Sequence, residues 1–101
     1  MKYQVLQIRE DRCTEKAAMD AMIMGEVDPA FFLSAYEIVC EIEAADLDEV
    51  FEIGNVGPEK NIIRFDRMHS VSVGDVIRDD RGRCFVVSCI GFTRLGEKEA
   101  A

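Results

Sequence analysis

Two adjacent segments near the middle of the chain follow different hydrophobic periods, and this contrast constrains the fold most. Apolar and polar residues alternate over 36–43, which is typical of a half-buried strand with a mostly acidic outer side. The side predicted to face the core carries Tyr36, Ile38, Cys40 and Ile42. From 46 to 53 the apolar residues recur at helical spacing instead. Asp46 and Glu49 resemble a capping box, and Gly54-Asn55 predicts the C-terminal end of this helix.

Short apolar runs predict the remaining strands. Residues 3–8 form a β-type run almost at the N-terminus. Residues 76–77 and 84–87 flank the polar turn 79–83, which is typical of a β-hairpin. Residues 70–73 predict a further short strand. Because a hairpin pairs its strands antiparallel, we expect a mostly antiparallel sheet.

Strong helix formers over 14–24 predict a helix that is capped by Thr14 and stopped by Gly25. Asp28-Pro29 predicts a second short helical turn over 30–33. The first helix is apolar nearly all round, which favours burial in the core, with an adaptable contact surface as the alternative. The side chains in question are Met19, Met22, Met24, Phe31 and Phe32.

These elements predict one α+β domain over 1–95: a small, bent, mostly antiparallel sheet with two or three packed helices. A chain of 101 residues is long enough for one core only. Residues 55–69 are the least regular stretch and either pack through Ile62, Ile63 and Phe65 or serve as a functional loop. Residues 96–101 are expected to be a frayed tail.

Composition excludes several classes of protein. Hydrophobic residues make up 49% and charged residues 32%, so a mostly disordered chain is excluded. No run of about 18 apolar residues is present, so no membrane span is expected. Without a signal peptide we expect a cytoplasmic protein with reduced thiols. The cysteines, Cys13, Cys40, Cys84 and Cys89, lack the paired spacing of a zinc site, so we predict no metal.

Charges are strongly segregated along the chain. Between 17 and 59 there are eleven Asp or Glu but no Lys or Arg, and the net charge of the whole chain is −8. One interpretation is a solvated acidic face that keeps a small protein soluble. The other is a surface that binds a basic partner or imitates a phosphate backbone. The residues predicted to form that surface are Glu37, Glu41, Glu43, Asp48, Glu49 and Glu52.

The second half of the chain is mildly basic and offers an alternative of a different class. Its basic side chains can contact nucleic acid through phosphate groups, although the overall charge disfavours such binding. The candidate residues are Lys60, Arg64, Arg67, Arg78, Arg81 and Arg83. Because Asp79 and Asp80 are interleaved with these arginines, a self-neutralised turn is the plainer interpretation.

Catalytic signals are weak. His69 precedes Ser70 and Ser72, but neighbouring residues on an extended chain point apart, and no orienting acid is evident. Residues 54–58 are rich in glycine but follow a helix and lack the Lys and Ser/Thr of a phosphate loop. We therefore predict no catalytic residues and no cofactor.

Three blocks of sequence together resemble the YodL-like domain family, small proteins of tailed bacteriophages and conjugative elements. They are the strand 3–8, the helix Leu47-x-x-x-Phe51-x-x-x-Asn55, and Ser70-Val-Ser-Val-Gly-Asp-Val76 with the later strand ending in Gly91-Phe92. The resemblance covers most of 3–92. In the last block Gly74 permits a tight bend and Asp75 can bond its own backbone there.

The resemblance implies no established catalytic residues. The occurrence of this family in bacteriophages and conjugative elements favours a role in host takeover or counter-defence. We therefore expect a non-enzymatic accessory protein of a bacteriophage or mobile element. It is expected to act in the cytoplasm of the bacterial host, by contact with a host protein through the acidic surface. Nucleic-acid binding through the basic residues is the alternative.

Overall fold

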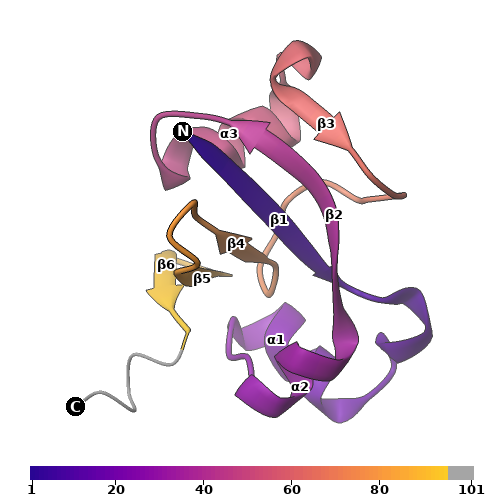
Figure 1. Ribbon diagram of the computed structural model, residues 1–101. Helices are drawn as coiled ribbons and strands as arrows, with labels where there is room; N and C mark the ends of the chain where they lie inside the picture. The colour runs from indigo at the N-terminus through magenta and orange to yellow at the C-terminus, as the bar shows by residue number, and fades with distance from the viewer. Residues whose placement is uncertain (96–101) are drawn as a thin grey trace.

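The strands form one six-stranded antiparallel sheet in the order β3-β2-β1-β4-β5-β6 (Figure 1). This computed structural model describes residues 1–95. The strands are β1 Lys2–Ile8, β2 Tyr36–Glu43, β3 Ile62–Arg64, β4 Val76–Arg78, β5 Cys84–Ser88 and β6 Gly91–Arg94. Three α-helices pack on the sheet, so the predicted α+β class with a bent, antiparallel sheet is confirmed. The predicted tail 96–101 lies outside the described residues.

The helices are α1 Lys16–Met24, α2 Pro29–Ala35 and α3 Leu47–Val56, and single 3-10 turns occupy Glu10–Arg12 and Glu59–Asn61. Asp28 caps α2 as predicted, because its carboxylate accepts a hydrogen bond from the Phe31 N–H at 3.0 Å. The predicted Thr14 cap is wrong: the residue before α1 is Glu15, and its side chain makes no capping bond. No helix within residues 1–95 combines the length and the apolar character that crossing a membrane requires.

A β-bulge in β2 divides that strand between the two faces of the sheet. Val5 lies opposite Cys40, but the next residue, Leu6, lies opposite Ile38, so Val39 is an extra residue in the ladder. Cys40 therefore shares a face with Val5, whereas Ile38 shares the other face with Leu6. The prediction that one side of 36–43 faces a single core is wrong for this reason.

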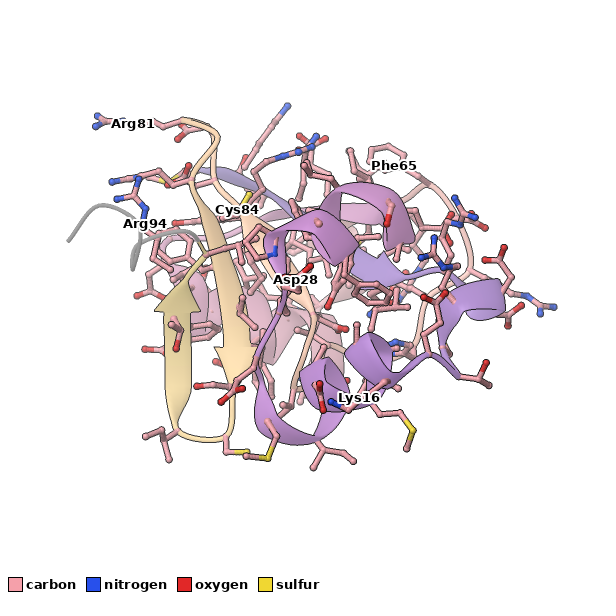
Figure 2. The ribbon with its side chains drawn as sticks, turned by 90° about the horizontal axis from the view of Figure 1, so that it is seen from below. Lys16, Asp28, Phe65, Arg81, Cys84 and Arg94 are labelled. Atoms are coloured by element: carbon pink, nitrogen blue, oxygen red, sulfur yellow. The ribbon has the colours of Figure 1, made fainter. Side chains whose placement is uncertain are left out.

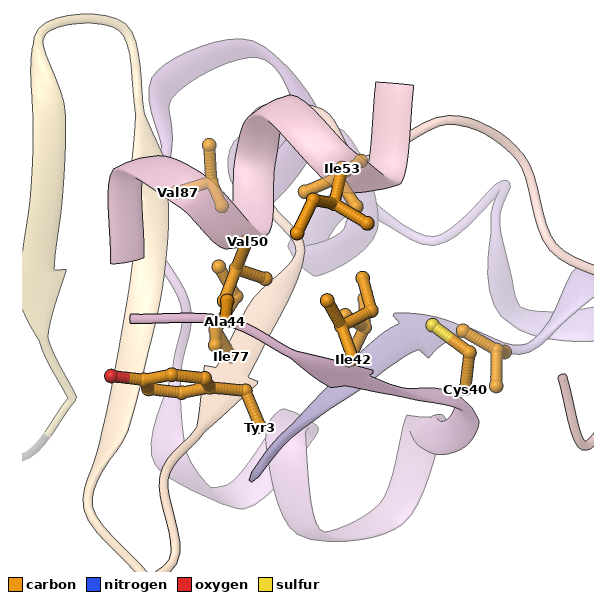
Figure 3. Close-up of a cluster of buried hydrophobic side chains, with 11 residues drawn as sticks. Tyr3, Cys40, Ile42, Ala44, Val50, Ile53, Ile77 and Val87 are labelled. Carbon is orange, nitrogen blue, oxygen red and sulfur yellow. The ribbon is translucent and has the colours of Figure 1, made fainter. Parts of the chain in front are cut away.

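Both faces of the sheet are covered by helices. On the face of Val5, the core cluster includes Val50 and Ile53 of α3 (Figure 3). On the face of Leu6, the cluster includes the half-buried Phe32 of α2. Figure 1 shows α3 near the start of β1 and the α1–α2 pair near its end. The end of β1 is therefore the place where α1 and the loop before β4 meet.

Helix α3 begins as predicted, with the Glu49 N–H donating to Asp46 Oδ1 at 2.9 Å. It continues through Gly54 to Val56, so the predicted end at Gly54-Asn55 is wrong. Gly54 serves close packing instead, because a Cβ built on it would lie 2.4 Å from the Val71 side chain. Val50 and Ile53 form the buried side of the helix, whereas Phe51 is 39% exposed.

The loop between α3 and β4 differs from the prediction in two places. Residues 70–73 form no strand, because the Asp75 N–H donates to the Ser72 carbonyl and turns the chain before a ladder can form. Residues 62–64, predicted to be irregular, form the edge strand β3. Ile62 is half-buried there, but Ile63 and Phe65 are each 56% exposed, so they do not anchor the loop.

Helix α1 buries only its small side chains, Ala18 and Ala21. Gly74 packs against this part of the helix, since a Cβ at Gly74 would lie 2.6 Å from the Ala21 carbonyl oxygen. Of the residues predicted to fill the core, Phe31 is buried and Phe32 half-buried. The prediction is wrong for the methionines, because the close approach of the Ala18–Ala21 side turns the longer side chains to solvent. The exposed members are Met19, Met22 and Met24.

Candidate functional site

The bulge in β2 separates the acidic residues that were predicted to form one row. Glu41 lies opposite Gln4 and Glu43 opposite Lys2, which places both on the face of Leu6. Glu37 lies opposite Gln7, on the face of Val5. The structure therefore brings Glu41 and Glu43 together and places Glu37 elsewhere.

The acidic residues of α3 are all exposed. Asp48 and Glu52 lie one turn apart, on the side away from the buried Val50 and Ile53. Glu49 is also exposed but flanks this side, because it lies one turn before Ile53. Within the described chain, none of these three carboxylates makes an ion pair with a basic group. The Glu49 carboxylate accepts a hydrogen bond from the Ala45 N–H at 3.1 Å and so also caps the helix.

The predicted basic residues are divided between two parts of the sheet, and half are engaged locally. The Arg64 guanidinium makes two hydrogen bonds to Glu59 on the β3 edge, and Arg83 pairs with Asp79 at 2.7 Å in the β4–β5 hairpin. Arg78 Nε donates to Gln4 Oε1 at 2.8 Å. The side chains of the other three predicted residues have neither an ion pair nor a hydrogen bond in the described part of the chain: Lys60, Arg67 and Arg81.

A buried polar cluster lies where the end of β1 meets the loop before β4. Gln7 is almost fully buried, and its amide Nε2 donates to Asp75 Oδ2 at 2.9 Å and to the His69 carbonyl oxygen at 3.0 Å. Gln7 Oε1 accepts from the His69 N–H at 3.3 Å. The Ser72 N–H also donates to Asp75 Oδ2, at 3.0 Å. Strand β1 and the loop before β4 thus meet at one carboxylate.

Burial raises the pKa of Asp75 to about 6 from an ordinary value of 3.8, although the Ser72 N–H, the nearby His69 and Gln7 act in the opposite direction. The Asp75 side chain is only 5% exposed, whereas the His69 side chain is 61% exposed. His69 Nε2 lies 4.0 Å from Asp75 Oδ1, which is too long for a hydrogen bond. Asp75 is therefore a buried carboxylate whose Oδ2 is held by neutral donors.

Two pockets flank this cluster and share Ile8 and His69. The first, of about 390 Å³, is lined by Glu10, Glu37 and Asp66 together with Arg67, among others. The second, of about 350 Å³, is lined by Ile8, Cys13, Met22, His69, Ser72, Val73 and Asp75. The first pocket thus carries carboxylates, and the second combines apolar walls with the buried Asp75.

The groups around the second pocket do not form a nucleophile–base pair. Cys13 Sγ lies 3.4 Å from the Arg9 carbonyl oxygen, and His69 Nδ1 lies 2.7 Å from the Ser70 carbonyl oxygen, so both point to backbone acceptors. Among residues 1–95, no three His, Cys, Asp or Glu side chains are grouped as metal ligands. The arrangement is suited to binding a hydrogen-bond donor.

The sequence predicts Asp75 only as a turn residue and predicts no role for Gln7 beyond the strand 3–8. The signal that points to them is Gln7 itself, a polar residue on the side of β1 that carries Tyr3 and Val5. A buried amide in such a strand requires polar partners. Its partners, however, lie more than 60 positions away along the chain.

Comparisons with family models, with curated proteins and with solved structures find no match to this chain. The resemblance to the YodL-like domain family therefore stays a prediction.

Proposed function

We propose that the protein is a non-enzymatic accessory protein that acts by contact with a basic partner protein through the acidic side of α3. The observation that supports this function is the group Asp48, Glu49 and Glu52, three exposed carboxylates of α3 without basic partners in the described chain. Val50 and Ile53 anchor the opposite side of α3 in the core. Unpaired charges on a rigid helix favour fast, orientation-specific association with a basic surface.

The setting of this function rests on the sequence resemblance. A YodL-like protein of a bacteriophage or mobile element would act in the cytoplasm of the bacterial host, in host takeover or counter-defence. In this proposal the partner is a host protein. Glu41 and Glu43 lie on the face of Leu6, opposite the face of the sheet that α3 covers, so the proposed contact is made by α3 alone.

Charge reversal on α3 tests the proposal. Tagged wild-type protein and the Asp48→Lys/Glu52→Lys variant are used to capture proteins from a bacterial lysate at several salt concentrations, with identification by mass spectrometry. The matched control is Asp20→Lys/Glu26→Lys, which makes the same change in net charge away from α3. We expect a partner that is lost only with the α3 variant and released by salt. Equal loss of the partner with both variants, or no loss with either variant, would contradict the role of α3.

Nucleic-acid binding is the second candidate function, and one feature of the hairpin end favours it. Arg81 lies at the β4–β5 turn, and Arg94 lies at the same end of the sheet, where the Leu95 N–H bonds the Cys84 carbonyl (Figure 2). Both guanidinium groups point outward in that view. A gel shift with short DNA or RNA tests this function, and Arg81→Glu/Arg94→Glu is expected to abolish a salt-dependent shift. No shift of wild-type protein at low salt would exclude it.

A further inference from the structure

Only one oxygen of the Asp75 carboxylate accepts hydrogen bonds from the described residues. Oδ2 accepts hydrogen bonds from Gln7 Nε2 and the Ser72 N–H, whereas Oδ1 accepts none from the described residues. In residues 1–95 every side-chain polar atom that is sealed from solvent has a hydrogen-bond partner. Oδ1 is therefore not sealed, and it reaches solvent through the 350 Å³ pocket that Asp75 lines. The fold presents an acceptor of fixed position to this pocket.

The wall of the pocket is suited to a short alkyl chain. Ile8, Met22 and Val73 supply apolar surface from β1, α1 and the loop before β4. Met22 is an unbranched side chain that adapts to ligands of different shape. The side chain of His69 is largely exposed and lies at the boundary with the neighbouring pocket. A ligand that fits has an apolar body and one strong donor.

The surrounding charge favours a cationic donor. The neighbouring pocket carries Glu10, Glu37 and Asp66 against the single guanidinium of Arg67. Apart from His69, no basic side chain pairs with Asp75 in the described chain. A buried carboxylate without a cation is costly, and an ammonium group bound to it would relieve that cost.

We propose that the pocket between α1 and the loop 69–75 binds an alkylammonium group, with Asp75 Oδ1 as its acceptor and the Ile8–Met22–Val73 wall around its alkyl chain. The same chemistry has two sources, a free alkylamine or the lysine side chain of another protein. This site is separate from the acidic side of α3, so its test does not depend on the proposed function.

Amine titrations of the isotope-labelled protein, followed by NMR, test the proposal. The probes are n-pentylamine, cadaverine and a capped lysine, and n-pentanol is the neutral match. We expect the amines to shift the signals of the Ser72 and Asp75 amides and the Gln7 side-chain amide. A charged hydrogen bond favours pentylamine over pentanol about tenfold or more. Tighter binding of capped lysine than of the free amines indicates a protein source, and the reverse order indicates a small molecule.

Two variants and a control identify the acceptor. Asp75→Asn keeps an oxygen for Gln7 and Ser72 and is expected to weaken pentylamine binding at least tenfold. Met22→Lys places a competing ammonium group at the pocket wall and is also expected to weaken pentylamine binding at least tenfold. It leaves Gln7, Ser72 and Asp75 unchanged. Glu26→Gln, which removes an exposed carboxylate elsewhere, is expected to leave the affinity unchanged. The proposal is overturned if no amine shifts these signals, if pentanol binds equally well, or if both variants bind like wild type.

Discussion

Replacing Asp75 with Asn is expected to stabilise the protein near neutral pH and not in acid. The variant keeps a side-chain oxygen where Oδ2 accepts from Gln7 and Ser72, and it removes the charge. The groups that face Asp75 are His69 at 4.0 Å, Tyr36 on β2, whose hydroxyl donates to the Gly74 carbonyl, and Cys13 across the pocket. All of them are retained in the variant.

The direction of this change in stability follows from the raised pKa of Asp75. The native state holds this proton up to about pH 6, whereas the unfolded chain releases it near 3.8. Between these values the native state binds more protons, so the contribution of Asp75 to stability falls as pH rises. The full difference corresponds to about 3 kcal/mol above pH 6. The buried amide of Asn has a desolvation cost of its own, so we expect a gain of about 1–2 kcal/mol at pH 7.5.

Urea unfolding of both proteins between pH 4 and 8 measures this effect by linear extrapolation. Other carboxylates, such as Glu59 beside Arg64, have lowered pKa values and make both proteins less stable in acid. The free energy of unfolding of the variant minus that of wild type cancels these contributions. That difference is expected to rise between pH 4 and 6 and then to level off. A constant difference, or one that falls with pH, would refute the reasoning.

Three further changes test the packing and the caps. Gly54→Ala is expected to lower the free energy of unfolding by about 1–2 kcal/mol, because the added Cβ overlaps the Val71 side chain. This loss outweighs the better helix propensity of Ala. Urea unfolding measures it, and unchanged stability would contradict the close packing. Asp28→Ala removes the cap of α2 and is expected to cost about 1 kcal/mol in the same assay, with an unchanged midpoint as the contrary result. Asp79→Ala leaves the Arg83 guanidinium and two backbone N–H groups without their acceptor. Thermal unfolding is expected to show a loss of about 2–3 kcal/mol in the free energy of unfolding. A loss below about 0.5 kcal/mol would contradict these hydrogen bonds.

The local pattern of the sequence was sufficient for elements whose signals lie within a few residues. The strand 36–43 and the β4–β5 hairpin form where they are predicted, and Asp46 and Asp28 cap their helices as their positions indicate. These features depend on backbone propensity and on short-range hydrogen bonds, which neighbouring residues determine. The α+β class follows from the same signals.

The assignment of residues to faces required the assembled sheet. The predicted acidic row depended on an unbroken alternation, and the extra residue at Val39 places Glu37 on the opposite face from Glu41. Nothing in residues 36–43 indicates the bulge, because it is defined by pairing with β1. The exposure of the α1 methionines likewise depends on Gly74, which approaches Ala21 from a distant part of the chain.

The environment of the buried Asp75 carboxylate also depends on the tertiary structure and not on the local sequence. Gln7, Ser72 and Asp75 each have an ordinary local role in sequence, in a strand or a turn. Only when β1 lies against the loop before β4 does Asp75 lose water on most sides and gain two neutral donors. Because desolvation depends on every group packed around the carboxylate, the raised pKa and the pocket beside it are properties of the folded molecule. The charge run along 17–59, by contrast, can be read directly from the sequence.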